Sequence, residues 1–352
     1  MRAVAVRRGE SSPSVVERPR PDPEPGEALV ETHRVGVDGT DHAILAGHHG
    51  GFPEGSDELV LGHEAVGRVA DANDTGFSEG DVVVPMVRRP PPSGTNEYFE
   101  RGEPDMAPPG AYVERGIEGA DGYMAEYFTA PEAYLVPVPE DLYDLGFLVE
   151  PVSNAVKAIE HARAARSAFE WEQESALVLG NGPLGLLTLA ILDAERTYCL
   201  GRRDRPDPTV DVIEALGATY VDSRETPVPD VPDAHEAVDA VYEATGHAPH
   251  AFEAVEALAP NGVAALLGVP ERGWEFEVPG SDLHHEMVMQ NKAVLGSVNS
   301  GRGHFERAVE HVESLSEGFL DRFVTGVYGF DDLAAAFDEG DTTIKTAVQV
   351  RV

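Results

Sequence analysis

The sequence predicts an α/β protein built from a β-rich domain and a second domain with a doubly wound parallel sheet. Its 352 residues exceed what one hydrophobic core usually serves, so about two domains are expected. Up to about residue 85, short β-like runs alternate with glycine, proline and aspartate, which is typical of a compact β domain. From about Phe147, helix and strand patterns alternate, which indicates a parallel sheet covered on both faces.

The β-rich part contains strand-like runs such as residues 27–32 and 67–70. From about Arg88 to Gly122 the pattern becomes irregular, with prolines clustered in 89–94 and 107–110. We expect an extended loop or lobe there, because proline removes backbone donors and interrupts helices.

In the second part, helices are expected over 150–165, 184–195, 209–216 and 249–258, and strands over 176–179, 197–200, 240–244 and 262–267. A further helix, 304–315, is followed by short strands that end at 346–350. In the simplest arrangement the tail rejoins the first domain. The expected domains are therefore 1–147 with 300–352, and 148–299.

Acidic residues outnumber basic ones by 63 to 26, and Lys157, Lys292 and Lys345 are the only lysines. A net charge of −37 repels itself in dilute buffer but is tolerated in molar salt, where the screening length falls to about 3 Å. An acidic protein that binds basic partners would instead cluster its acid in a tail or block. The scattered acid predicts a salt-accumulating cytoplasm and disfavours nucleic acid as a partner.

Cysteine and hydropathy exclude other classes. The single cysteine, Cys199, excludes an internal disulfide framework and a cysteine-built zinc cluster, and its apolar surroundings predict a buried strand residue. The first residues alternate like a strand, so no signal peptide is expected. No apolar run approaches the roughly 18 residues of a membrane span, so no membrane partner is expected.

A glycine-rich turn, Gly180-Asn181-Gly182-Pro183-Leu184-Gly185, follows an expected strand and opens an expected helix. In that context the first glycine allows the tight turn, the second lets a pyrophosphate approach the backbone, and the third permits close helix packing. The helix N-terminus favours the anion. An ordinary glycine turn is the alternative, but the flanking elements favour a dinucleotide site.

The residues after the next expected strand distinguish NADP from NAD. An NAD enzyme places an acid about 20 residues after the turn to bind the ribose hydroxyls. This chain instead has Gly201-Arg202-Arg203, in which glycine leaves room and the arginines offer forked donors suited to a phosphate. Surface charge is the alternative, yet such a cluster is unexpected in so acidic a chain. NADP is therefore favoured, with NAD possible.

Three short motifs carry acidic or imidazole side chains: residues 36–42, Gly62-His63-Glu64, and Glu150-Pro151. Alone, His63 is more often a hydrogen-bonded histidine than a metal ligand. Together with the glycine-rich turn, the motifs resemble the medium-chain, zinc-dependent alcohol and polyol dehydrogenases over essentially the whole chain. Within that superfamily the sequence is most similar to the glucose dehydrogenases of salt-loving archaea.

The resemblance implies a GroES-like catalytic domain, a Rossmann cofactor domain, and one catalytic zinc held by Asp38, His63 and Glu150, with Glu64 as an exchangeable ligand. Asp38 stands where the family usually has cysteine. Zinc accepts carboxylate oxygen, but the harder site selects zinc less strongly over magnesium or manganese. The family's four cysteines for a structural zinc have no counterpart between Arg88 and Tyr112, so no structural zinc is expected.

A catalytic metal lowers the pKa of a bound hydroxyl and so prepares hydride transfer to the nicotinamide. Thr40 is expected to relay the proton, and His42 either passes it on or only orients a ligand. The resemblance implies an aldose, D-glucose first, oxidised at C1 to the lactone. Glu114, Glu150 and Asn299 match glucose-contacting positions in the similar enzymes, although Glu114 and Asn299 could instead be solvated loop residues.

Two other functions remain open at this stage: a polyol or alcohol dehydrogenase of the same superfamily, and a metal-free dinucleotide-binding reductase. A metal-free relative has no reason to keep Asp38, His63, Glu64 and Glu150 together. Members of the family are dimers or tetramers, and the absence of a cysteine-bound zinc in the lobe favours a homodimer.

Overall fold

In a computed structural model, which describes residues 1–273 and 275–351, the chain divides into two compact units. The first contains Met1–Ser153, Asn299–Ser314 and the chain from Val324 onward, and the second contains Asn154–Val298 and Leu315–Phe323. These limits differ from the expected boundaries at 147 and 299. They also move residues 315–323 to the second unit, because α10 (Glu317–Phe323) packs on α5 (Pro208–Ala215).

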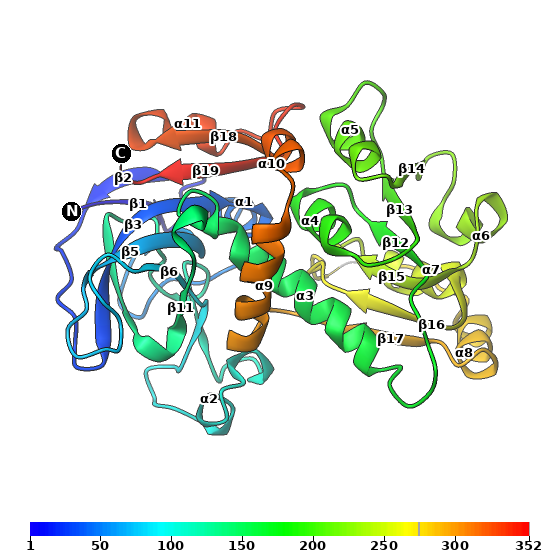
Figure 1. The fold of residues 1–352 in the computed structure, drawn as a ribbon, viewed down its shortest axis with the longest axis horizontal. Coiled ribbons are helices and arrows are strands. Elements are labelled where there is room, and N and C mark those ends of the chain that lie inside the picture. Colours follow the sequence, from blue (N-terminus) through cyan, green and yellow to red (C-terminus); the bar gives the residue numbers. More distant parts are fainter. Residues whose placement is uncertain (274, 352) are drawn as a thin grey trace. The chain divides into compact units, whose positions relative to one another are not determined.

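The first unit is built on a seven-stranded sheet in the order β11-β6-β5-β3-β19-β18, with β10 also paired to β3 (Figure 1). Its strands are β3 (Glu27–Val37), β5 (Glu64–Asp71), β6 (Val82–Pro85), β10 (Tyr127–Pro131), β11 (Leu135–Pro137), β18 (Val324–Gly329) and β19 (Lys345–Gln349). The C-terminal strand β19 runs antiparallel to β3, with Thr346 opposite Val37. Buried valine, leucine and alanine side chains on these strands form one core.

Two small sheets and short helices complete this unit. The sheets are β1 (Arg2–Arg7) with β2 (Ser14–Glu17) and β4 (Glu58–Val60), and β7 (Arg88–Arg89) with β8 (Val113–Arg115) and β9 (Gly119–Ala120). The helices are α1 (Gly39–Leu45), α2 (Glu97–Glu100), α9 (Arg302–Ser314), α11 (Leu333–Ala336) and the start of α3 (Val149–Ala164). The segment 88–122 therefore contains α2 and three short strands, where the sequence predicts only a loop or lobe.

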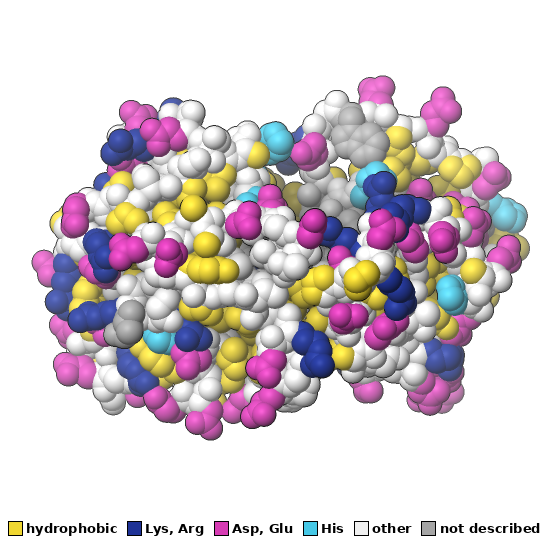
Figure 2. Space-filling view, turned by 90° about the horizontal axis from the view of Figure 1, so that it is seen from above, with side chains coloured by type: hydrophobic (Ala, Val, Ile, Leu, Met, Phe, Trp, Pro, Cys, Tyr) yellow, Lys and Arg dark blue, Asp and Glu magenta, His cyan; other side chains and the backbone are white. Residues whose placement is uncertain are grey.

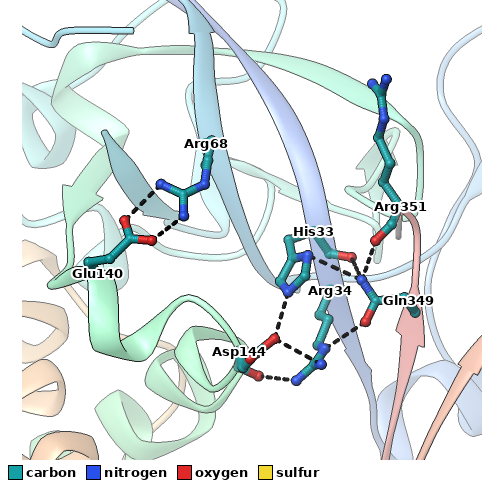
Figure 3. A network of polar contacts seen from close by, with 7 residues as sticks. All are labelled: His33, Arg34, Arg68, Glu140, Asp144, Gln349 and Arg351. Carbon is teal, nitrogen blue, oxygen red and sulfur yellow. Dashed lines mark hydrogen bonds and ion pairs between the residues drawn. The ribbon is translucent and has the colours of Figure 1, made fainter. Parts of the chain in front are cut away.

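A polar network fastens β19 to β3 and to the turn before α3 (Figure 3). His33 Nε2 lies 2.8 Å from Asp144 Oδ1, and Arg34 donates to the Asp144 carbonyl at 2.7 Å. Arg34 Nε also donates to Gln349 Oε1 at 2.8 Å. Arg34 and Gln349 are 315 residues apart in the sequence, so the network joins the C-terminal strand β19 to the N-terminal strand β3.

The second unit has a six-stranded, wholly parallel sheet in the order β14-β13-β12-β15-β16-β17 (Figure 1). The strands are β12 (Ser175–Leu179), β13 (Arg196–Gly201), β14 (Thr219–Asp222), β15 (Val238–Glu243), β16 (Leu258–Leu266) and β17 (Ala293–Gly296). The helices are α4 (Pro183–Ile191), α5, α6 (Val231–Ala234), α7 (His250–Ala257), α8 (Gly280–Met289) and α10. The strand order reverses beside β12, and every residue of β12 is buried. Doubly wound folds bind their ligands at such a reversal.

The predicted α/β fold class is thus confirmed, and most expected elements agree with the structure to within one or two residues. The expected helix 184–195 is too long. It ends at Ile191 because Leu192 adopts an extended conformation, with ψ at 133°.

On the face shown in Figure 2, acidic side chains are scattered and outnumber basic ones. No helix among residues 1–273 and 275–351 has the length and apolar character needed to cross a membrane.

Candidate functional site

The four predicted ligand residues lie close together in the first unit. Asp38 precedes α1, His63 and Glu64 lie at the start of β5, and Glu150 lies in the first turn of α3. Ligand atoms of His63, Glu64 and Glu150 lie within 4.8 Å of one another, as do those of Asp38, Asp41 and His63. His63 belongs to both groups and therefore joins them into one cluster.

The N-terminus of α1 fixes the carboxylate of Asp38. Its Oδ1 accepts hydrogen bonds from the backbone of Thr40 at 2.9 Å and of Asp41 at 3.1 Å. Its Oδ2 accepts from Thr40 Oγ1 at 2.9 Å and lies 3.6 Å from His63 Nε2. Asp38 is thus an N-cap that faces the imidazole, and the predicted relay residue Thr40 contacts it directly.

The cluster is buried and strongly charged. Burial opposes ionisation of Asp38, but the charges of His63 and Lys345 outweigh it and lower the pKa of Asp38. Burial likewise opposes protonation of His63, yet Asp38 raises the pKa of His63 well above its usual value. Burial, reinforced by the charge of Asp38, raises the pKa of Asp41 to about 8. Without a bound cation, ionised Asp38 is therefore balanced by a protonated His63, while Asp41 is largely neutral at pH 7.

Lys345 is a residue beside the candidate ligands that the sequence did not point to. It lies on β19 with its side chain 1% exposed, donates to the carbonyl of Val37 at 2.9 Å, and forms an ion pair with Glu64. Burial raises the pKa of Glu64, and Lys345 opposes that rise. A lysine inside an apolar strand, in a chain with only three lysines, was the signal that could have found it.

The residues of this cluster fit a zinc ion. Imidazole nitrogen and carboxylate oxygen are ligands that zinc accepts. The Nδ1 atom of His63 is buried and makes no hydrogen bond with the described residues, so the ring orientation is not set by a hydrogen bond at that nitrogen. Binding a metal requires a neutral imidazole, so it would displace the proton that Asp38 stabilises on His63.

His42 lies in the last turn of α1, and its side chain contacts Glu339 and Phe337. Its Nδ1 is 3.8 Å from Glu339 Oε2, and its ring meets Phe337 edge-on. Among the described residues, no hydrogen bond joins the His42 side chain to Thr40. The structure brings Thr40 to the predicted ligands but leaves His42 apart from them.

The predicted sugar residues Glu114 and Asn299 come together at a second polar cluster in the first unit. Arg88 on β7 lies opposite Glu114 on β8, and its Nε donates to Glu114 Oε1 at 2.9 Å. Asn299 Nδ2 lies 3.5 Å from the same oxygen. Glu114 Oε2 accepts no hydrogen bond from the described residues, and it therefore remains available as an acceptor for a ligand. Arg88, which is buried and stacked on the Tyr112 ring, is a second residue that sequence reasoning missed.

The glycine-rich turn has the geometry that its sequence predicts. Gly180 has a φ of 112°, in the region that favours glycine. A Cβ at Gly185 would lie 1.9 Å from the carbonyl oxygen of Gly180, so helix α4 packs against the turn only without one. Gly182 caps α4 ahead of Pro183 and faces open space, which lets a ligand approach the helix N-terminus beside Leu184.

The end of β13 adjoins this turn. A Cβ at Gly201 would lie 2.7 Å from the Asn181 side chain, so a larger residue there would have to displace that side chain. Arg202 and Arg203 follow and are exposed. Arg203 lies 3.9 Å from Asp207 Oδ2, whereas Arg202 makes no hydrogen bond or ion pair with the described residues. Both guanidinium groups are therefore accessible to a bound phosphate.

Family comparisons agree with this arrangement. Residues 24–140 match the family described as alcohol dehydrogenase GroES-like domain, and residues 143–350 match that described as glucose dehydrogenase C-terminus. The chain is 63% identical to glucose 1-dehydrogenase of Haloferax mediterranei, with 99% of both chains covered. It is 38% identical to glucose 1-dehydrogenase of Thermoproteus tenax, with both chains fully covered.

Solved structures give the same result. Haloferax mediterranei glucose dehydrogenase in complex with NADP, zinc and gluconolactone superimposes with a TM-score of 0.98, at 63% identity and full coverage of both chains. A D38C mutant of that enzyme also superimposes with a TM-score of 0.98, at 62% identity and full coverage. The 2R,3R-butanediol dehydrogenase of Bacillus subtilis, at 22% identity, 99% coverage of both chains and a TM-score of 0.81, shares the fold.

Proposed function

The chain belongs to the glucose dehydrogenase family, and we propose that it oxidises D-glucose at C1 to the lactone with hydride transfer to NADP. The observation that carries the proposal is the likeness at 63% identity to an enzyme whose structure holds NADP, zinc and gluconolactone. The buried cluster of Asp38, His63, Glu64 and Glu150 supports it. A polyol dehydrogenase or a metal-free reductase has no comparable support.

We propose that Asp38, His63 and Glu150 hold the zinc ion, with Glu64 as an exchangeable ligand. Zinc bound there supplies a Lewis acid that lowers the pKa of a sugar hydroxyl. Lys345 balances Glu64 when that carboxylate is not a ligand. Because Asp38 replaces a softer thiolate, magnesium and manganese compete better here than at a cysteine-containing site.

The proton of the sugar hydroxyl is proposed to leave through Thr40. Thr40 Oγ1 donates to Asp38 Oδ2, so to pass the proton towards His42 its O–H must turn from Asp38 to an acceptor on the path to His42. His42, which is one-quarter exposed beside Glu339, is then the group that exchanges the proton with solvent. Its separation from Thr40 requires a water molecule or another hydroxyl between them.

Glu114, Glu150 and Asn299 are proposed to bind the sugar hydroxyls. Arg88 occupies one oxygen of Glu114, so the other accepts from the substrate. NADP is proposed to bind along the turn of residues 180–185, with Gly201, Arg202 and Arg203 at its 2′-phosphate. NAD lacks that phosphate and would bind more weakly.

We propose further that the protein acts as a homodimer in a salt-accumulating cytoplasm. The edge strand β17 is flanked by the exposed apolar side chains of Val288, Met289 and Val298. An edge strand with exposed apolar side chains before and after it in the sequence suits a second copy. Light scattering in molar KCl would give the mass, and Val288→Glu with Met289→Glu is expected to yield monomers.

Steady-state kinetics in 2 M KCl test the proposed activity. With NADP we expect turnover of glucose well above that of sorbitol and ethanol, and loss of turnover after treatment with a strong chelator. Added zinc should restore the rate. Turnover of sorbitol or ethanol without aldoses would refute the sugar assignment, and full activity after chelation would refute the metal assignment.

A further inference from the structure

A pocket in the second unit contains hydrogen-bond donors that no part of the proposed reaction uses. Arg166 follows α3, and Trp171 and Gln173 lie in the connection that leads to β12. All three line one pocket of about 460 Å³, together with Arg163 and Phe169. This volume lies within the range of small-molecule sites.

Four nitrogen atoms of these residues are buried without a partner among the described residues. They are Arg166 Nε and Nη2, Trp171 Nε1 and Gln173 Nε2. Tyr242 orients the Gln173 side chain, because its hydroxyl donates to Gln173 Oε1 at 2.6 Å. The amide nitrogen Nε2 then has no acceptor among the described residues. All four nitrogens can only donate, so only an acceptor can satisfy them.

Arg166 gives the pocket its charge. Its residue is 6% exposed, and Nη1 donates to the carbonyl of Asn291 at 3.0 Å. The edge formed by Nε and Nη2 is the planar fork that matches the two oxygens of a carboxylate. Although the chain has 63 acidic residues, no carboxylate pairs with Arg166 among the described residues. An anion from elsewhere would neutralise this buried cation and satisfy the donors that the protein leaves unpaired.

The pocket rim limits the charge of the anion. Four acidic residues line the pocket: Glu172, Glu174, Asp193 and Glu195. Two of them, Glu174 and Glu195, form ion pairs with Arg196 at 3.7 and 3.5 Å. An acidic rim repels multiply charged oxyanions more strongly than a singly charged one. The four donor nitrogens are covered from solvent, so the ligand must displace side chains such as the exposed Phe169, whose ring lies 5.9 Å from the Arg166 guanidinium.

We propose that Arg166, Trp171 and Gln173 form a binding site for a single carboxylate, supplied by a small organic acid or by an acidic side chain of a second copy. The fork of Arg166 binds the two oxygens, and the indole and amide N–H groups donate to them. The site lies wholly in the second unit and is independent of the proposed activity.

Fluorescence of Trp171 tests the proposal in the full chain. In a Trp274→Phe background, Trp171 is the only tryptophan, so its emission reports the pocket. Potassium acetate is titrated to 100 mM in 2 M KCl at constant ionic strength. We expect a saturable change with a midpoint in the millimolar range. Chloride stays near 2 M throughout the titration. If the pocket binds halide and not carboxylate, it therefore stays occupied by chloride and Trp171 emission does not respond to acetate. That result would overturn the proposal.

Two variants compare matched arginines. Arg166→Met is expected to raise the acetate midpoint at least tenfold, whereas Arg163→Met, at an exposed arginine lining the same pocket, should leave it within twofold. Equal midpoints in both would overturn the proposal. If Arg166→Met does not fold, Trp171→Phe removes one N–H and keeps a smaller aromatic ring. Acetate should then raise the melting temperature less than in the parent protein, and an equal rise would overturn the site.

Protein concentration separates the two sources of the carboxylate. If a second copy supplies it, Trp171 emission changes with protein concentration, acetate has little effect, and Arg166→Met abolishes the concentration dependence. Trp171 emission that changes with neither acetate concentration nor protein concentration would overturn the proposal.

Discussion

At the scale of single residues, Lys345 and Glu64 form a buried ion pair of the first unit, with side chains 1% and 2% exposed. Lys345→Met leaves the Glu64 carboxylate in the interior without its cation. We expect the free energy of unfolding to fall by about 3–5 kcal/mol, as for other buried pairs that lose one partner. Denaturant unfolding of the metal-free protein in 2 M KCl measures this change.

The matched control removes both charges. Lys345→Met combined with Glu64→Gln should recover part of the lost stability, because no uncompensated charge remains. If the single and double variants were equally unstable, lost packing rather than charge would explain the effect.

Asp38→Cys separates two roles of one residue. Cysteine loses the carboxylate that caps α1, which is expected to cost about 1 kcal/mol of stability in the metal-free protein. The thiolate is a softer ligand, so the zinc dissociation constant should fall at least tenfold while stimulation by manganese weakens. Competition with a chromophoric chelator measures zinc affinity. Asp38→Asn, which keeps a capping oxygen but loses the charge, should weaken zinc binding, and tighter binding by that variant would contradict the ligand assignment.

The proximity of the candidate ligands could be predicted where short motifs contain them. Asp38, His63 and Glu64 stand in two such motifs, and the structure brings them together with Glu150. Lys345 and Arg88 were missed because their partners, Glu64 and Glu114, are 281 and 26 positions away in sequence. Only the pairing of β19 with β3, and of β7 with β8, creates those contacts.

At the scale of elements, the turn after β13 is expected to set cofactor preference. Arg202→Ala with Arg203→Ala removes donors that suit a 2′-phosphate. The loss of one or two charge-assisted hydrogen bonds, at about 1.5–3 kcal/mol each, should raise the KM for NADP by tenfold or more and leave the KM for NAD nearly unchanged. Initial rates with both cofactors measure the difference.

Arg205→Ala is the matched control for that turn. Arg205 belongs to the same arginine cluster, but it forms an ion pair with Glu214 on α5 at 2.5 Å. We therefore expect its loss to affect both cofactors little. Equal increases of KM for NADP and NAD in the Arg202/Arg203 double variant would refute the phosphate assignment.

The predictability of elements follows from how local their causes are. The strand–turn–helix around Gly180 is specified by glycine positions and hydrophobic periodicity, so it could be placed closely. The strands β7, β8 and β9 could not, because two of them have two residues each and form only by pairing with one another. The assignment of residues 315–323 to the second unit likewise depends on the packing of α10 on α5, which no local pattern encodes.

At the scale of the whole molecule, the net charge of −37 makes stability depend on salt. Mutual repulsion acts over about 10 Å at 0.1 M salt and over about 3 Å at 1 M. We expect the protein to be folded in 2 M KCl and to unfold as the salt is diluted towards 0.1 M. An uncharged osmolyte such as sucrose at matched water activity should not replace the salt.

Cys199 reports this unfolding because it is the only cysteine and is fully buried on β13. Burial raises the pKa of its thiol to about 12, above the ordinary value near 8.5. At pH 8 the thiol of the folded protein is therefore both inaccessible to a thiol reagent and protonated. Below pH 8.5 the thiol is protonated in both the folded and the unfolded protein. Between pH 8.5 and 12 only the unfolded thiol ionises, so the free energy of unfolding falls as the pH rises. Labelling should therefore be slow in 2 M KCl at pH 8 and should accelerate with the loss of circular dichroism on dilution. Fast labelling in 2 M KCl would contradict the burial of Cys199, and a folded, unlabelled protein at 0.1 M KCl would show that charge repulsion does not limit stability.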